Sequence, residues 1–111
     1  GRPTFTDQLA AGIFHLLDAQ AAYGTYDLTG TGAVRSWYDI AAKVFELRNG
    51  NGDAVVPVST AEYYAGVQGP IAPRPVHSAL SLGKIARTGF SPRDWEDELA
   101  DYVRGLSRDL D

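Results

Sequence analysis

Apolar residues recur at helical spacing over residues 4–20. The stripe is aliphatic and would occupy one face of a helix: Leu9, Ile13, Leu16 and Leu17. Thr6 is placed to cap this helix, with Asp7 in the first turn, where the helix dipole favours negative charge. His15 lies off the stripe, so we expect its side chain to face solvent.

A second helical pattern begins at Ser36. Asp39 follows three positions later, which is the polar pattern of a helix start. The residues expected to form its buried face are Trp37, Ile40, Ala41, Val44 and Phe45. Gly50 suits the left-handed position that follows the last turn of a helix, so we expect the helix to end there.

Two further helices are predicted towards the C-terminus. Residues 81–90 favour a short helix closed by Gly89. Ser91 is placed to cap the last helix, and Pro92 suits its first position. The residues that share one face of this last helix are Trp95, Leu99, Tyr102, Val103 and Leu106.

Strand patterns are short. Residues 25–29 lie between glycines and favour a strand, and residues 53–60 favour another, with Pro57 indicating a sheet edge. Residues 58–80 show neither a helical nor a strand period and predict a long loop. The order of these elements predicts one α/β domain over residues 1–111, with about four helices and a few short strands, too few for a complete doubly wound sheet.

The composition limits the classes of function. The chain has 111 residues, 44% hydrophobic and 22% charged, as globular domains do. It has no cysteine, which excludes a disulfide framework, a thiolate zinc site and a cysteine nucleophile. A net charge of −4 with scattered arginines argues against nucleic acid, and no apolar run approaches the roughly 20 residues of a membrane span. The acidic run 94–101 predicts a solvated helix face, and the cytoplasm is the simplest location.

The sequence lacks the common motifs of redox and hydrolytic chemistry. Two glycine triplets begin like dinucleotide-binding loops, but Arg35 and Val55 stand where the last glycine belongs. Neither Lys43 nor Lys84 has a tyrosine four positions earlier, as a short-chain dehydrogenase requires. G-x-S-x-G and H-E-x-x-H are also absent. The chain is therefore predicted to hold no catalytic group, cofactor site or metal site.

Arg74 is the strongest binding candidate in the long loop. Its guanidinium offers a bidentate fork for phosphate, and Pro73 and Pro75 restrict the backbone on both sides. A stiff loop loses less entropy on binding. The alternative is that this stretch only spans a surface and that Arg74 pairs with an acidic neighbour.

Other side chains carry weaker indications of a binding site. Tyr63 and Tyr64 can stack a base or a sugar, although packing is the favoured interpretation. Trp37 is expected in the core rather than as a ligand platform. His77 and Ser78 can contact phosphate or hydroxyl groups, although solvation at the surface is favoured.

Several motifs, in order along essentially the whole chain, resemble the C-terminal part of dTDP-4-dehydrorhamnose reductases, which are extended short-chain dehydrogenases/reductases. The most specific are G-x-P-T before the first helix, S-W-Y-D at the second, and R-P-x-x-S-x-L followed by a lysine. Their positions are Gly1, Pro3 and Thr4; Ser36, Trp37, Tyr38 and Asp39; and Arg74, Pro75, Ser78, Leu80 and Lys84.

The resemblance implies an NADPH-dependent reduction at C4 of dTDP-4-dehydro-L-rhamnose in dTDP-L-rhamnose biosynthesis. In that family an N-terminal Rossmann part binds NADPH and carries the catalytic Thr/Tyr/Lys group. The resemblance therefore implies that this chain is the C-terminal substrate-binding lobe of a longer enzyme, holds no cofactor and is inactive alone. The substrate-binding residues that it implies are Arg74, Pro75, Ser78, Thr4 and Trp37. A stand-alone nucleotide-sugar-binding module and an interaction domain, forming a homodimer through an apolar face, stay open as alternatives.

Overall fold

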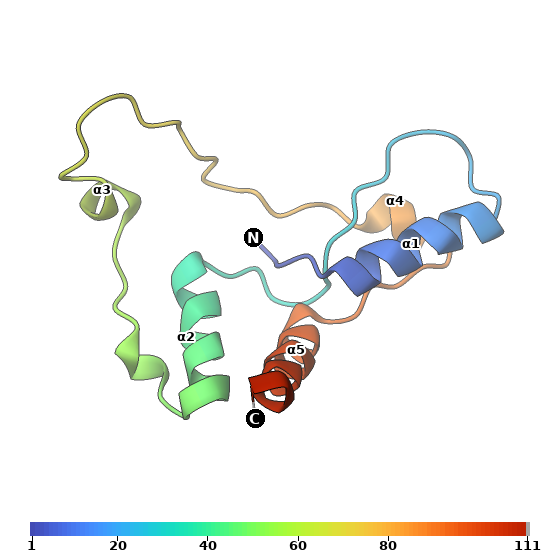
Figure 1. Cartoon of the computed structure of the whole chain (residues 1–111). Helices are drawn as coiled ribbons and strands as arrows, with labels where there is room; N and C mark the ends of the chain where they lie inside the picture. Colours follow the sequence, from blue (N-terminus) through green and yellow to red (C-terminus); the bar gives the residue numbers. More distant parts are fainter. Residues whose placement is uncertain (111) are drawn as a thin grey trace.

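The structure, a computed structural model, describes residues 1–110, with side chains for residues 1–106. Its helices follow one another as α1 (Thr6–Asp18), α2 (Trp37–Asn49), the 3-10 helix η1 (Gly52–Ala54), α3 (Thr60–Tyr63), α4 (Gly83–Ala86) and α5 (Trp95–Leu110). Figure 1 shows α2 and α5 near one another, α1 and α4 together on another side, and long connecting segments between them. The predicted helices are all present, and α3 is an additional one.

α2 begins and ends where the sequence predicts. The Ser36 hydroxyl accepts a hydrogen bond from the Asp39 backbone N–H at 3.2 Å, and the Asp39 carboxylate accepts one from the Ser36 N–H at 3.0 Å. Hydrogen bonds from the Ser36 backbone and side chain hold the pKa of Asp39 below its ordinary value of 3.8. Gly50 ends the helix with a φ of 71°, a left-handed conformation that glycine adopts without strain.

The core lies between α2 and α5. On α5, Trp95, Leu99 and Val103 are buried, as their shared face predicts. The partly buried residues packed against them are Phe5, Ile40, Val44 and Leu47. Tyr102 and Leu106, predicted on the same face of α5, are exposed, and so is Phe45 of α2. The core is therefore narrower than the two stripes predict, because α2 and α5 cover only part of each other.

The last helix begins later than predicted, at Trp95 and not near Ser91. Thr31 forms a parallel bridge with Asp94: its N–H donates to the Arg93 carbonyl and its carbonyl accepts from the Trp95 N–H, each at 3.0 Å. This pairing keeps the chain extended up to Asp94. The Asp94 carboxylate then accepts from the Glu96 N–H at 2.8 Å and takes the capping position predicted for Ser91.

Two predictions for α1 are wrong. The helix already includes Thr6, and Phe5 precedes it without a side-chain cap. His15 does not face solvent: it is half-buried, its Nε2 lies 2.9 Å from the Thr88 carbonyl oxygen, and its ring lies 5.4 Å from the Phe90 ring. The helix packs through Gly12, whose missing side chain leaves room for Leu28 and Phe90. The less exposed face of α1 therefore combines Gly12 and His15 with Leu16.

Three of the four residues of the aliphatic stripe of α1 face outward, whereas Leu16 is half-buried. Ile13 is 51% exposed and Leu17 is 68% exposed, and Leu9 and Phe14 are exposed as well. Figure 1 shows α1 lying along one side of the molecule, away from the α2–α5 core. A helix normally buries its apolar stripe, so this face is suited to contact with another surface.

The predicted strands do not form. Within residues 1–110 the only β pairing is the isolated bridge at Thr31. Residues 25–29 are held by side-chain hydrogen bonds instead, with Thr29 bonded to the Pro3 carbonyl at 3.2 Å. The segment 53–60 contains the end of η1, and at its other end Ser59 caps α3 with Glu62. The α/β class is therefore not confirmed, since the described chain is built from helices and irregular segments.

The molecule is more open than a compact domain of its size. Its radius of gyration is 17.1 Å, whereas a compact chain of this length has about 13 Å. Its accessible surface is 8166 Å², against roughly 6,000 Å² for a compact monomer of this mass. Every residue from 65 to 80 is exposed, and Figure 1 shows this stretch arching away from the core.

Candidate functional site

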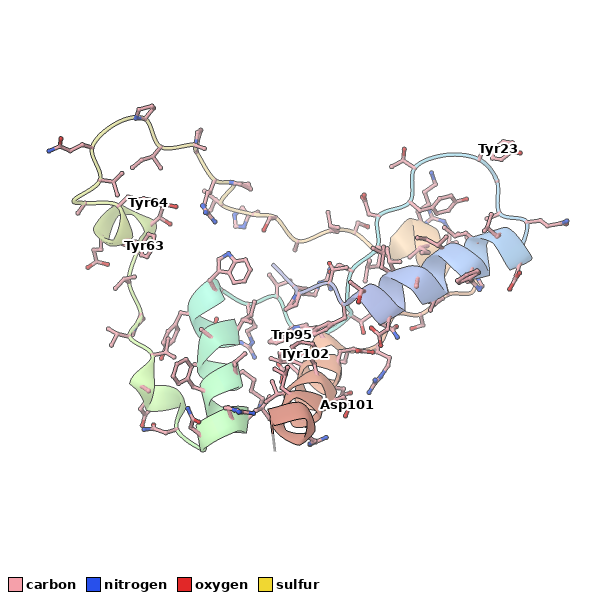
Figure 2. The ribbon with its side chains drawn as sticks, in the orientation of Figure 1. Tyr23, Tyr63, Tyr64, Trp95, Asp101 and Tyr102 are labelled. Atoms are coloured by element: carbon pink, nitrogen blue, oxygen red, sulfur yellow. The ribbon has the colours of Figure 1, made fainter. Side chains whose placement is uncertain are left out.

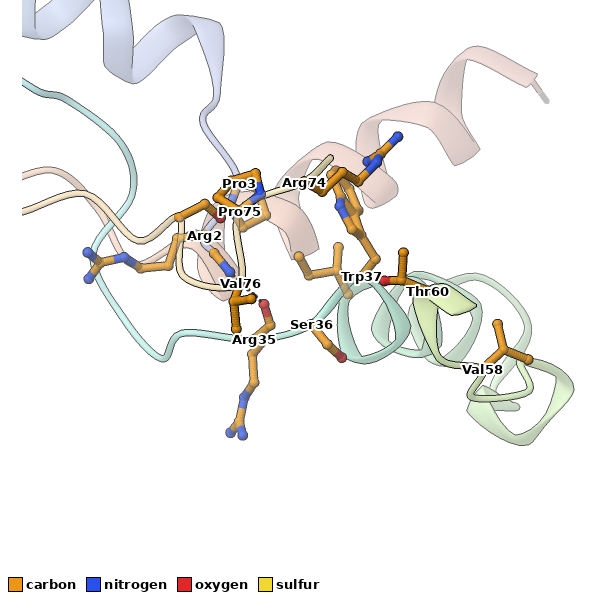
Figure 3. Close-up of a pocket in the computed structure, with 13 residues that line it drawn as sticks. Arg2, Pro3, Arg35, Ser36, Trp37, Val58, Thr60, Arg74, Pro75 and Val76 are labelled. Atoms are coloured by element: carbon orange, nitrogen blue, oxygen red, sulfur yellow. Dashed lines mark hydrogen bonds between the residues drawn. The ribbon is translucent and has the colours of Figure 1, made fainter. Parts of the chain in front are cut away.

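A pocket of about 570 Å³ lies where the start of the chain, the beginning of α2 and the long loop meet. Its volume is in the usual range for small-molecule sites. The residues that line it are Gly1, Arg2, Pro3, Arg35, Ser36, Trp37, Ile40, Val58, Thr60, Arg74, Pro75, Val76 and Ser78. They come from four segments of the chain, residues 1–3, 35–40, 58–60 and 74–78, and Figure 3 labels residues from each. Four of the five residues predicted to bind substrate are among them.

The first two residues of the chain fasten the pocket together. The Gly1 amino group donates to the Arg35 carbonyl at 2.8 Å, and the Arg35 N–H donates to the Gly1 carbonyl at 2.9 Å. The Arg2 guanidinium donates to the Leu80 carbonyl at 2.6 Å and to the Gly32 carbonyl at 3.4 Å. Gly1 and Arg2 therefore bind both the segment that leads into α2 and the end of the long loop.

Arg74 lies on the wall that the loop contributes, next to Pro75. Among the residues that the structure describes, none forms a hydrogen bond or ion pair with its side chain, so the predicted alternative of an acidic partner is not what the structure shows. None of the lining residues is acidic, whereas three are arginines. Because backbone carbonyls engage the Arg2 guanidinium, and the Arg35 side chain extends away from Trp37 and Arg74 (Figure 3), Arg74 is the lining cation available to a ligand.

The prediction that Trp37 lies in the core is wrong. The helical pattern places it in the core, yet its side chain is 78% exposed and lines the pocket. The reason is its position at the first residue of α2, before the turns that pack on α5 through Ile40 and Val44. Trp95 closes this end of the core instead, with its indole N–H donating to the Ala33 carbonyl at 2.7 Å.

The remaining predicted binding residues divide into two groups. Ser78 lines the pocket, near Gly1. Thr4 does not line it: its hydroxyl is 2.8 Å from the hydroxyl of Thr29, and this contact ties the chain start to the turn before residue 30. His77 is exposed and is not among the lining residues. The structure therefore brings Ser78 to the pocket and gives Thr4 a structural contact.

The adjacent tyrosines lie away from the pocket. The rings of Tyr63 and Tyr64 contact each other edge to face, with centroids 5.0 Å apart. Figure 2 shows the pair at the α3 end of the molecule, far from Trp95 and Tyr102. Packing in the core, the favoured interpretation, is not observed: Tyr63 is 71% exposed, and the rings contact each other.

The glycine triplet 30–32 does not fit the pyrophosphate of a dinucleotide. An added Cβ on Gly30 would meet the Cβ of Trp95 at 2.9 Å, so this glycine is required by close packing. Gly32, with a φ of 106°, lies against the carboxylate of Asp94, which would repel a phosphate.

Lys84, from the last resemblance motif, donates to the Thr25 carbonyl at 2.7 Å and lies 4.6 Å from the Tyr26 ring centroid. These residues hold loops together and do not form a cofactor site.

The acidic run on α5 is not wholly solvated. Glu98 is 5% exposed, and its carboxylate accepts from the Arg93 guanidinium at 3.1 Å. Arg93 also contacts Asp101 at 3.0 Å, so one cation bridges two carboxylates. Burial, together with the nearby carboxylate of Asp7, raises the pKa of Glu98 above its ordinary value of 4.5, against the opposing effect of Arg93. This cluster joins α5 to the start of α1, outside the pocket.

Sequence reasoning missed Arg2 and Arg35 as parts of the pocket. Their positions next to the G-x-P-T and S-W-Y-D motifs are the signal that was available, because residues beside two converging motifs come together when the motifs do. Val58 and Thr60, on the entry to α3, carry no such signal.

Comparison with known proteins identifies the family. The family model described as "RmlD substrate binding domain" matches residues 1–108. The chain belongs to the RmlD substrate binding domain family. This membership confirms the resemblance to the C-terminal part of dTDP-4-dehydrorhamnose reductases.

Two curated proteins are similar to this RmlD substrate binding domain. Over 100 residues it is 33% identical to a Streptomyces antibioticus protein named probable dTDP-4,6-dihydroxy-2-methyloxan-3-one 4-ketoreductase, with 89% of the chain and 32% of the relative covered. Over 107 residues it is 30% identical to a dTDP-4-dehydrorhamnose reductase of Mycolicibacterium smegmatis (strain ATCC 700084 / mc(2)155), with 96% of the chain and 31% of the relative covered. The chain spans about a third of the length of these relatives. No solved structure matches. Among the described residues, no helix is long and apolar enough to cross a membrane.

Proposed function

We propose that this RmlD substrate binding domain binds the dTDP part of a dTDP-sugar as one lobe, residues 1–111, of an NADPH-dependent dTDP-4-dehydrorhamnose reductase. The observation that carries the proposal is Arg74, which has no partner among the described residues and lines a pocket without acidic side chains. The names of both relatives refer to dTDP-linked keto sugars and support the same substrate class.

The chemistry of the pocket suits a diphosphate. Arg74 offers a planar donor group for phosphate oxygens, and such charge-assisted hydrogen bonds are stronger than neutral ones. Pro73 and Pro75 restrict the backbone of Arg74, so little conformational entropy is lost when it binds. The role of this lobe is to hold the nucleotide-sugar, and positioning of this kind can contribute several kcal/mol to a reaction between bound groups.

The redox step belongs to another part of the enzyme. Because the glycine triplet 30–32 does not fit a pyrophosphate, no step of NADPH chemistry is assigned to this chain. We propose that a Rossmann domain of the longer protein covers the aliphatic face of α1, with Ile13 and Leu17 in the contact. The surface of this chain exceeds that of a compact monomer by roughly 2,000 Å², which is ample for such an interface.

Calorimetric titration of the chain with dTDP tests the proposal. Binding is expected, and Arg74→Ala should weaken it by about 1.5–3 kcal/mol, as loss of a charged hydrogen bond does. Arg87→Ala is the matched control, because Arg87 is exposed just after α4 and outside the pocket. No binding of dTDP, or equal losses in the two variants, would remove the pocket from the proposal.

An NADPH-oxidation assay with dTDP-4-dehydro-L-rhamnose tests the division of roles. The 111-residue chain should show no turnover, whereas a longer protein that also contains the dinucleotide-binding domain should reduce the sugar. Turnover by the short chain would contradict the assignment of the redox step to another domain.

A further inference from the structure

Trp37 presents its indole to the pocket although the chain has a core that it does not join. It is 78% exposed, whereas Trp95, the other tryptophan, is 1% exposed. Aromatic side chains contribute strongly to cores and interfaces because of the large apolar area that they bury. A tryptophan left open in a pocket therefore indicates a surface that a ligand covers.

The backbone that carries Trp37 is held in place before any ligand binds. Ser36 and Asp39 exchange two hydrogen bonds around the first turn of α2, at 3.2 and 3.0 Å. The Arg35 backbone is paired with Gly1 on the other side. A side chain mounted on such a constrained backbone loses little freedom on binding, which favours its use as a rigid platform.

The surroundings of Trp37 favour a nucleobase over a sugar ring. Cations and apolar side chains share the pocket with it, namely Arg35, Arg74, Pro75 and Val76. A sugar needs several free polar groups for its hydroxyls. The Ser36 hydroxyl is already bonded to Asp39 at 2.8 Å, which leaves the hydroxyls of Thr60 and Ser78 on the pocket wall. A planar base carrying a diphosphate matches an aromatic face beside the unpaired guanidinium of Arg74. Figure 3 shows Trp37 and Arg74 reaching the pocket from different elements, α2 and the long loop.

We infer that Trp37 is the platform on which the base of a nucleoside diphosphate stacks, while Arg74 holds its phosphates. The inference rests on the proposed function and assigns the nucleotide, not the sugar, to this part of the pocket. Stacking on an aromatic side chain tolerates different bases, so Trp37 supplies affinity for the nucleoside rather than selection of thymine.

Tryptophan fluorescence provides a direct measurement. Trp95 is buried, so a change of emission on adding ligand reports on Trp37. We expect dTDP to quench the emission of the chain, inorganic pyrophosphate to bind without quenching, and glucose 1-phosphate to leave the emission unchanged. In Trp37→Phe, where Trp95 is the remaining tryptophan, dTDP should no longer quench, and the Trp95 emission reports that the core is intact.

Affinities of variants complete the test. Trp37→Leu should weaken dTDP binding about 5- to 100-fold and leave pyrophosphate binding unchanged, with Trp37→Phe in between. Tyr23→Leu is the matched control, since Tyr23 is a fully exposed aromatic residue outside the pocket, and it should change neither affinity.

Four results would overturn the inference. Unchanged dTDP affinity in Trp37→Leu, with no quenching in the unmodified chain, would remove Trp37 from the site while the Arg74 proposal stands. Equal losses for dTDP and pyrophosphate would show that Trp37 supports the loop. Quenching by glucose 1-phosphate but not by dTDP would assign Trp37 to a sugar. If dTDP does not bind at all, this inference and the proposed function both fail.

Discussion

The guanidinium of Arg2 donates a 2.6 Å hydrogen bond to the carbonyl of Leu80, joining the start of the chain to the end of its long loop. The same guanidinium reaches the Gly32 carbonyl at 3.4 Å. Neither hydrogen bond involves the side chains proposed to bind the ligand, those of Arg74 and Trp37. Both fix the distance between the wall that carries Arg74 and the wall that carries Trp37.

Replacing Arg2 by alanine should therefore loosen the pocket without removing a ligand contact. We expect faster backbone hydrogen exchange in residues 76–82, weaker dTDP binding, and a loss of about 1 kcal/mol in the free energy of unfolding. Hydrogen exchange read by mass spectrometry and a urea titration measure these effects. Unchanged exchange at the end of the loop would show that Arg2 does not hold it.

Replacing Pro75 by alanine should weaken dTDP binding while leaving the guanidinium of Arg74 in place. The variant gives the loop more conformations to lose on binding, at a cost of about 0.4–1 kcal/mol. Pro57→Ala is the matched control, because Pro57 is exposed, precedes α3 and does not line the pocket. Calorimetry should assign the loss in Pro75→Ala to the entropy of binding, and a loss of the same size in Pro57→Ala would refute the role of local stiffness.

Replacing Gly30 by alanine should destabilise the fold. The new Cβ would lie 2.9 Å from the Trp95 Cβ and 3.2 Å from the Pro3 carbonyl oxygen, and neither neighbour is a flexible side-chain end. Overpacking of this kind typically costs about 1–3 kcal/mol. At Gly66 an added Cβ meets nothing within 4 Å, so Gly66→Ala should be close to neutral. Thermal unfolding of both variants distinguishes close packing at Gly30 from a general effect of glycine replacement.

Helices were predictable here because their signals are local. The hydroxyl of Ser36 and the carboxylate of Asp39 lie within one helical turn of each other. The buried residues of α5 follow helical spacing, namely Trp95, Leu99 and Val103. The strands failed because a strand needs a partner from elsewhere in the chain. Residues 25–29 have no neighbouring strand among the described residues; instead, the Thr29 hydroxyl donates to the carbonyls of Arg2 and Pro3.

The sequence predicted some of the residues that line the pocket, and it failed where packing decides which side chains are exposed. Arg74 between two prolines indicates an anion ligand from the sequence, and the structure places it in a pocket. The exposure of Trp37 and of the α1 stripe contradicts helical periodicity, because periodicity shows which face is apolar and not what covers it. Arg2 was missed because its contacts with Gly32 and Leu80 span 30 and 78 positions of the sequence.

Replacing Glu98 by glutamine should change how stability depends on pH. Burial and the nearby Asp7 raise the pKa of Glu98 in the folded state, so between its unfolded value near 4.5 and the raised value the folded chain binds more protons. This group therefore stabilises the fold at low pH, and its contribution falls as pH rises through that interval. Glutamine does not titrate and retains an oxygen that can accept from Arg93, 3.1 Å from the present carboxylate. The free energy of unfolding of the unmodified chain, relative to Glu98→Gln, should fall with rising pH and then level off.

Asp39→Asn provides the control of opposite sign. Hydrogen bonds from Ser36 lower the pKa of Asp39, so the stability that it contributes is present above its unfolded value near 3.8 and is lost as pH falls through the folded value. The unmodified chain, relative to Asp39→Asn, should therefore gain stability as pH rises. Urea unfolding from acid to neutral pH measures both differences. If the Glu98→Gln difference also grows with pH, the ion pair with Arg93 outweighs the burial of Glu98, and the carboxylate stabilises this junction of α1 and α5 at neutral pH.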